Sequence, residues 1–159
     1  MSFEDVKQYF ENVGMEDRVI ELEKSSATVK EAAKVIGCKP CQIAKTLSFL
    51  VDGKPILIVA AGDSKVDNRK YKNTFNEKAK MIPACQVETL IGHAPGGVCP
   101  FAINKEVAVY LDISLKRFEK VYPAGGNDYS TVYLSLAKLE IHSHFIDWVD
   151  VCKDWSVDV

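Results

Sequence analysis

The sequence lacks any apolar run long enough to cross a membrane. Its longest uninterrupted apolar stretch, residues 55–61, is far shorter than the roughly 20 apolar residues that a membrane-spanning helix needs. The chain begins Met-Ser-Phe-Glu-Asp, which is acidic and lacks the basic-then-apolar profile of a secretory signal. We therefore expect a cytoplasmic protein with no membrane segment.

An excess of positive charge is also absent. The chain has 20 Lys and Arg against 22 Asp and Glu, and a net charge of −2 gives no overall attraction to nucleic acid. The charge is unevenly spread, because residues 65–80 carry six basic and two acidic side chains, whereas residues 140–159 carry one basic and five acidic. The basic segment is a candidate for phosphate contacts, with a solvated helix face as the alternative.

The cysteines form no pattern typical of a disulfide framework or a zinc site. There are five, an odd number, and without an export signal reduced thiols are expected. Cys38 and Cys41 have the spacing of a redox or metal pair, but no second pair completes a zinc site, so helix-end packing explains them better. His142 and His144 could share one face of a strand, yet no clear third ligand accompanies them. We expect no metal and no cofactor.

The composition is typical of a globular protein with mixed secondary structure. With 47% apolar and 26% charged residues, the chain can bury a sizeable core, and one domain covering residues 1–159 is expected. Capping boxes led by Ser2 and Thr28 support the first two helices. Residues 115–118 have a helical pattern, and residues 135–153 mix helix and loop. Periodicity and turn residues predict helices at 3–13, 28–36, 66–71 and 83–91, and strands at 18–22, 46–51, 55–61, 107–111, 120–122 and 131–134.

Two of these strands are expected to form a central hairpin. Asp52 and Gly53 connect the apolar stretches 46–51 and 55–61, and Asp-Gly is among the strongest two-residue hairpin signals. Residues 56–61 are apolar without interruption, which predicts burial on both faces. The sheet should therefore be covered by helices or curled into a barrel.

Lys45 lies just before the first of these strands. Because mainly apolar residues follow it, its ammonium would lie at the rim of the core, where partial desolvation lowers the pKa of a lysine. Such a group could orient a carbonyl, phosphate or ribose oxygen. The alternative is a snorkelling lysine, whose stem covers apolar surface while its charge reaches water.

Glycine and proline are concentrated in the loop that follows the fourth predicted helix. The adjacent Gly96 and Gly97 let backbone amides approach a ligand, and convergent amides can hold an oxyanion. The plainer interpretation is a tight connection between a helix and a strand. Cys99 lies in the same loop as His93, which suggests a nucleophile and a base, but a lone cysteine is more often a small buried apolar residue.

Taken together, these elements resemble the YbaK/ProX-like aminoacyl-tRNA deacylases. That family also supplies the editing domain inserted in many bacterial prolyl-tRNA synthetases, and the chain resembles a free-standing member. The similarity extends from about residue 28 to residue 139. The matching motifs occur in the family's order: Thr28-Val29-Lys30-Glu31-Ala32-Ala33, Ile36-Gly37, Gln42-Ile43-Ala44-Lys45-Thr46-Leu47, Gly96-Gly97-Val98-Cys99-Pro100-Phe101, Leu111-Asp112 and Ala124-Gly125.

The resemblance implies an α/β fold of the α+β type, with a mixed, barrel-like sheet surrounded by helices. It also implies a hydrolase that cleaves the ester between a small mischarged amino acid, Ala or Cys, and tRNA(Pro). The partner implied is the 3′ end of aminoacyl-tRNA, together with an aminoacyl-tRNA synthetase if one is needed. By resemblance Lys45 is the catalytic lysine, and the substrate-binding residues are Thr46, Gly96, Gly97, Val98, Cys99, Pro100 and Gly125. Cys99 is then a pocket wall and not a nucleophile.

Two other classes of protein stay open on the sequence. A non-catalytic member of the same fold could bind aminoacyl-tRNA or dock on a basic synthetase, which the acidic balance of the chain permits. A cysteine-dependent hydrolase or redox protein would instead use Cys99 or the pair Cys38 and Cys41. A Lys45 ammonium that faces the Gly96 loop across a small cavity would favour the deacylase.

Overall fold

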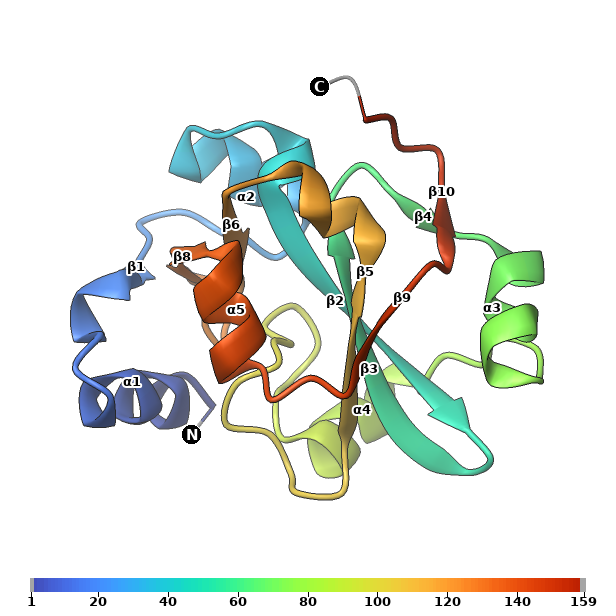
Figure 1. The fold of residues 1–159 in the computed structure, drawn as a ribbon. Coiled ribbons are helices and arrows are strands. Elements are labelled where there is room, and N and C mark those ends of the chain that lie inside the picture. Colours follow the sequence, from blue (N-terminus) through green and yellow to red (C-terminus); the bar gives the residue numbers. More distant parts are fainter. Residues whose placement is uncertain (1, 158–159) are drawn as a thin grey trace.

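The computed structural model describes residues 2–157, which fold around a curled, six-stranded mixed sheet. Strands β2 and β3 cross the middle of the molecule in Figure 1. This half-barrel confirms the mixed, barrel-like sheet that the resemblance implies. The order across the sheet is β8 (Leu134–Ser135), β6 (Lys120–Pro123), β2 (Ile43–Val51), β3 (Lys54–Ala61), β5 (Ala108–Asp112) and β9 (Asp147–Val149).

The central hairpin forms as predicted. Strands β2 and β3 pair in antiparallel register from Ala44 opposite Ala61 to Val51 opposite Lys54. The two turn residues between them have positive φ angles, 51° at Asp52 and 75° at Gly53, which is the geometry that an Asp-Gly turn favours. Residues 57–61 of β3 are completely buried, so that the strand contributes to apolar clusters on both faces of the sheet.

Helices supply the cover on both faces. Residues from α1 (Ser2–Asn12), α4 (Ala84–Ile91) and α5 (Leu136–His142) enter the larger cluster, which also contains Leu57 and Val59 of β3. On the other face, Tyr71 of α3 (Asn68–Phe75) packs with Phe49 and Ile58. Helix α2 (Val29–Ile36) contributes to a small third cluster beside Ile43, at the beginning of β2.

Local signals account for most helix boundaries. The Thr28 cap of α2 is confirmed, since its hydroxyl accepts a hydrogen bond from the Glu31 amide at 3.1 Å. Helix α1 already includes Ser2, so the expected Ser2 cap is wrong. The third helix was expected at residues 66–71 but begins at Asn68, because the Asp67 carboxylate accepts hydrogen bonds from two amides of its first turn.

Several short strands differ from the sequence prediction. Val66 belongs to β4 (Lys65–Val66), which pairs with β10 (Cys152–Lys153) near the end of the chain. The strand expected at 131–134 is two strands: β7 (Ser130–Val132), which pairs with β1 (Val19–Glu21), and β8, which pairs with β6. Residues 113–117 form a 3₁₀ helix capped by Asp112, close to the helical segment expected there. Such brief elements depend on partners that are distant in sequence.

The two histidines near the C-terminus do not share a strand. His142 is the last residue of α5, and its Nδ1 lies 2.9 Å from the Tyr9 hydroxyl, while His144 follows in the next loop with a φ of 52°. Within residues 2–157, no group of three His, Cys, Asp or Glu side chains is placed to hold a metal ion. None of the helices in these residues is long and apolar enough to span a membrane.

Gly62, the residue after β3, packs closely against the backbone of Pro40. A Cβ there would lie 2.1 Å from the Pro40 carbonyl oxygen and 2.7 Å from a Val29 methyl carbon. We expect Gly62→Ala to destabilise the protein by about 1–3 kcal/mol, because neither backbone nor β-branched neighbour can give way easily. Chemical denaturation compared with wild type tests this, and an unchanged midpoint would show that the turn can shift freely.

Candidate functional site

Strand β2 has an incomplete edge. One side of the strand pairs with β3 along most of its length, whereas the other side pairs with β6 only at Ile43 and Ala44. That second side regains a neighbour at Phe49, which bridges to Met81. Among residues 2–157, no ladder pairs with this edge at residues 45–47. An open edge leaves backbone donors and acceptors free to bind something else.

The open edge exposes polar groups of Thr46. The Ser48 carbonyl and the Leu50 amide on this side bond to the segment around Met81, and a strand directs every second residue's backbone groups to the same side. The amide and carbonyl of Thr46 therefore point to the open edge. Its side-chain Oγ1 is buried and has no hydrogen-bond partner among the described residues. A buried hydroxyl without a partner costs free energy, so a ligand that supplies one is favoured.

The gap in the sheet is a cavity of about 230 Å³. Neighbouring side chains leave opposite faces of a strand, yet both Lys45 and Thr46 border the cavity because it opens at the strand's edge. The remaining walls come from α2 and the segment before it, the beginning of β2, the end of β6, the 96–98 loop and β7: Ser26, Ala27, Thr28, Val29, Ala32, Ile36, Ile43, Ala44, Leu47, Gly96, Val98, Tyr122, Pro123, Ala124, Ser130 and Thr131.

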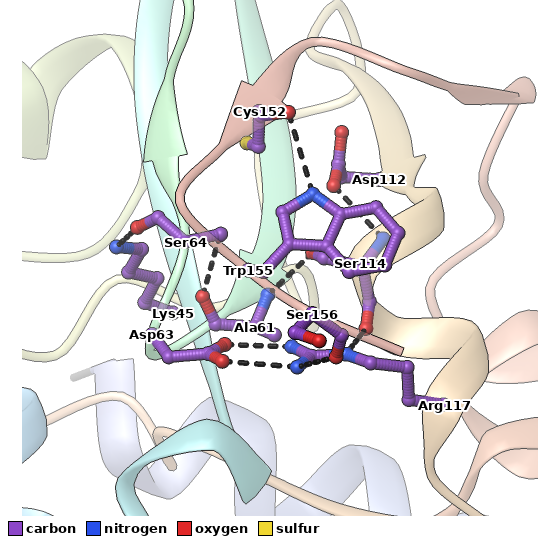
Figure 2. Close-up of polar contacts among 10 residues, drawn as sticks. All are labelled: Lys45, Ala61, Asp63, Ser64, Asp112, Ser114, Arg117, Cys152, Trp155 and Ser156. Atoms are coloured by element: carbon purple, nitrogen blue, oxygen red, sulfur yellow. Dashed lines mark hydrogen bonds and ion pairs between the residues drawn. The ribbon is translucent and has the colours of Figure 1, made fainter. Parts of the chain in front are cut away.

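Lys45 supplies the positive charge at this cavity. Its Nζ donates a hydrogen bond to the Ser64 carbonyl, as Figure 2 shows. The pKa of Lys45 is lowered chiefly because burial disfavours its charged form, and Lys65 lowers it further, while Asp63 and Cys152 act in the opposite direction. The lowered pKa expected from the position of Lys45 is therefore present, and the ammonium is bonded to a buried backbone carbonyl, whereas the charge of a snorkelling lysine reaches water.

The glycine loop lies directly against a second loop, residues 125–128. Gly96 has a φ of 95°, and a Cβ on it would lie 2.1 Å from a carboxylate oxygen of Asp128. Gly97 has no positive φ, but its Cβ would meet the Asn127 amide nitrogen at 2.5 Å. Gly125 is equally confined, since its Cβ would lie 2.5 Å from the Ser130 hydroxyl. Gly97 is therefore confined by the backbone of the second loop, and Gly96 and Gly125 are confined by side chains that pack against them.

The structure brings together part of the predicted site. Lys45, Thr46, Gly96 and Val98 all line the cavity. The other four predicted binding residues are not part of its lining. Gly97 packs against the second loop, and Gly125, in that loop, packs against Ser130. Cys99 is in the core, and Pro100 lines a separate hollow together with Tyr9. For Gly97, Cys99, Pro100 and Gly125, direct contact with substrate stays a prediction.

Cys99 is poorly suited to nucleophilic chemistry. It is completely buried, and burial raises the pKa of its thiol to about 12, so the thiol is protonated at neutral pH. Its Sγ lies 3.5 Å from His93 Nε2, but that nitrogen is also 2.6 Å from the Phe101 carbonyl. Burial lowers the pKa of His93, and the imidazole is neutral within the core. The pair that the sequence suggested as nucleophile and base is therefore part of the packing under the loop.

Sequence reasoning missed the hydroxyl groups that line the cavity. Ser26, Ser130 and Thr131 lie far apart in sequence and carry no recognisable spacing. They meet because the segment around Ser26 crosses the second loop, where the Ser26 amide and hydroxyl both donate to the Asp128 carbonyl, at 2.6 and 2.9 Å. Thr28 caps α2, as its sequence predicts, and it also lines the cavity.

A family model described as the aminoacyl-tRNA editing domain matches residues 23–141. The chain belongs to this family. Membership makes it a hydrolase that acts on the ester bond of aminoacyl-tRNA, and it confirms the YbaK-type resemblance seen in the sequence. Aminoacyl-tRNA is accordingly the class of molecule with which the chain interacts.

Three similar proteins illustrate the family. The uncharacterized protein YwhH of Bacillus subtilis (strain 168) is 47% identical over 157 residues, which cover 98% of this chain and 100% of that protein. A crystal structure described as a candidate trans-editing enzyme for prolyl tRNA synthetase superposes with a TM-score of 0.85 at 27% identity and covers 96% of this chain and 97% of that one. A proline–tRNA ligase of Bacillus licheniformis is 24% identical over 80% of this chain, which corresponds to 22% of the ligase.

The unpartnered hydroxyl of Thr46 gives a test of the cavity. Thr46→Val keeps the shape of the side chain but removes its hydroxyl, so we expect unchanged or slightly higher stability, by up to about 1 kcal/mol. If the hydroxyl binds the substrate, KM for aminoacyl-tRNA should rise about threefold to tenfold. Thr46→Ser, which keeps the hydroxyl, is the matched control. Equal kinetic parameters in both variants would contradict a binding role for this group.

Proposed function

We propose that this protein removes a small mischarged amino acid, Ala or Cys, from tRNA(Pro) in trans. The observation that carries the proposal is the open edge of β2, where Lys45 and Thr46 line one small cavity. The Lys45 ammonium is partly buried and bonded to the Ser64 carbonyl, and the buried Thr46 hydroxyl has no partner among the described residues. The match to part of proline–tRNA ligases and to a candidate trans-editing enzyme supports tRNA(Pro) as the carrier.

The chemistry needs little from a protein nucleophile. An aminoacyl ester is already activated, and water, the vicinal ribose hydroxyl or a side chain of the substrate can attack its carbonyl. Positioning of the ester and stabilisation of the developing oxyanion then carry the rate. Lys45 supplies a positive charge for the carbonyl or the ribose, and the edge amide of Thr46 supplies a fixed donor. The proposal gives Cys99 no covalent role.

The size and lining of the cavity support a small acyl group. A volume of about 230 Å³ lies below the roughly 300–1,000 Å³ of pockets for drug-sized ligands. Its apolar wall on α2 includes Val29, Ala32 and Ile36, which fit a short side chain. One methylene of difference changes binding by only about 1–3 kcal/mol, so we expect overlapping activity on Ala and Cys with a preference between them.

Two exposed lysines in the neighbourhood of Lys45 provide a surface for the RNA. Lys65 of β4 and Lys153 of β10 are directly opposite each other in their ladder, an arrangement of like charges that is unfavourable unless an anion lies between them. Lys65 is also close enough to Lys45 to lower its pKa. Asp67 balances part of the charge. This placement favours phosphate contact over a merely solvated helix face for this part of the basic segment.

Release of amino acid from defined substrates tests the activity. We expect the purified protein to deacylate Ala-tRNA(Pro) or Cys-tRNA(Pro) and to leave Pro-tRNA(Pro) intact, with loss of at least about 100-fold in rate for Lys45→Ala if the charge acts on the transition state. The circular dichroism spectrum of the variant should match wild type. Tight tRNA binding without release of any amino acid would instead favour a non-catalytic binding module.

The lysine surface makes a separate prediction. Reversing both charges in Lys65→Glu/Lys153→Glu should weaken binding of uncharged tRNA and reduce the slope of log affinity against log salt by about two, because two phosphate contacts are lost. The control is Lys54→Glu, at the tip of the β2–β3 hairpin, which makes the same lysine-to-glutamate change at one site away from this pair. A slope unchanged from wild type in the double variant would assign phosphate binding to another surface.

A further inference from the structure

A polar network surrounds the Ser64 carbonyl that accepts the hydrogen bond from Lys45, and its residues Asp63, Ser64 and Arg117 are not part of the cavity lining. The Ser64 carbonyl that receives the Lys45 ammonium belongs to a tight turn after β3, closed by a hydrogen bond from the Ser64 amide to the Ala61 carbonyl at 3.0 Å. The Ser64 hydroxyl donates to the same carbonyl at 2.7 Å. Because Ser64 is 1% exposed, the position of its carbonyl depends on protein contacts and not on solvent.

Arg117 holds this turn through Asp63. Its guanidinium donates two parallel hydrogen bonds to the Asp63 carboxylate, at 2.9 and 2.6 Å, as Figure 2 shows. The Arg117 side chain is 4% exposed, and such a paired geometry fixes direction as well as charge. The same 3₁₀ helix, residues 113–117, makes a second contact with the turn, because the Ala61 amide donates to the Ser114 hydroxyl at 3.0 Å.

Arg117 is itself held in place by its surroundings. Its Nε donates to the Ser114 carbonyl and its Nη1 to the Ser156 carbonyl, both at 2.9 Å. The guanidinium also lies over the ring of Trp155, 5.0 Å from the ring centroid, and 4.8 Å from that of Phe118. Few orientations satisfy all these contacts, so the guanidinium presents a preorganised fork to Asp63.

The Asp63 carboxylate matters because of its effect on Lys45. Asp63, Lys65 and Cys152 act on the Lys45 ammonium electrostatically. Burial raises the pKa of the Cys152 thiol to about 12, which leaves the thiol neutral at physiological pH. Among these three groups, only Asp63 is then negatively charged. Arg117 neutralises that charge and engages both of its oxygens, so the carboxylate cannot turn to form an ion pair with the lysine.

We propose that Arg117 is a positioning residue for Lys45. Through Asp63 it fixes the turn whose carbonyl receives the ammonium, and it keeps the Asp63 carboxylate from capturing the lysine that must face the substrate. This inference rests on the proposed role of Lys45 in deacylation. It assigns a function to an ion pair that lies outside the cavity and touches no substrate.

The test is a pH profile of deacylation, measured from about pH 6 to 10 for wild type and Arg117→Met. In the profile, the limb on which activity falls at high pH reports the loss of the Lys45 proton. Loss of Arg117 leaves Asp63 uncompensated and raises the pKa of Lys45, so we expect this limb to move to higher pH. We also expect kcat to fall at least about tenfold with KM within about twofold, as for a misplaced catalytic group. A merely structural role would lower the melting temperature without moving the limb.

Companion variants keep the proposal testable if Arg117→Met folds poorly. Asp63→Asn should move the limb to lower pH, and Arg117→Lys, which keeps the charge but loses the paired geometry, should leave it near wild type while kcat falls. The double variant Arg117→Met/Asp63→Asn should reverse the upward shift. A limb unmoved in both Asp63→Asn and Arg117→Met overturns the proposal. Lys45→Ala is run in parallel: if it stays active, the proposed function itself fails, whereas an inactive Lys45→Ala with unmoved limbs refutes only the role of Arg117.

Discussion

The site depends on one constraint, which is that β2 changes neighbours along a single edge. Strand β6 pairs with its first two residues, and the segment around Met81 takes over from Ser48 onward. Backbone polar groups inside a protein require partners, so a strand interrupted in this way is stable only where something else can satisfy it. Pairing with β3 continues along the opposite edge through residues 45–47, so the interrupted segment remains part of the sheet.

Electrostatics at the cavity follow from the same arrangement. The neighbouring residues Lys45 and Thr46 both line the gap, and they bring to it a lysine bonded to the Ser64 carbonyl and a buried hydroxyl without a partner among the described residues. Partial burial strengthens the field of the cation, because less water screens it. A polar turn behind Lys45 offsets part of the cost of burial by accepting its hydrogen bond. The ammonium is therefore held by the protein and is only partly hydrated.

Sequence patterns predicted the elements whose signals are local. The Asp-Gly turn, the Thr28 cap and the uninterrupted apolar strand β3 each act over a few residues, and all three appear in the structure. The partial burial of Lys45 was also predictable, because the apolar residues that follow it in the strand place it at the rim of the core. Short strands such as β4 and β10 were missed because they exist only through pairing across the chain. The ion pair between Asp63 and Arg117 joins the turn after β3 to the end of a 3₁₀ helix 54 positions later, and no sequence pattern around either residue predicts the other.

The family match ends at residue 141, but the folded unit does not. Strands β9 and β10 follow that position, and Val149, Val151 and Cys152 fill the apolar cluster on one face of the sheet. At the other end, Val6 and Phe10 of α1 precede residue 23 and are completely buried in the larger cluster. A fragment cut to residues 23–141 would therefore lose the buried side chains of α1 and of the C-terminal strands, and would leave apolar surface exposed on both faces of the sheet. The segments on either side of the family match are thus part of the core that keeps the matched region folded.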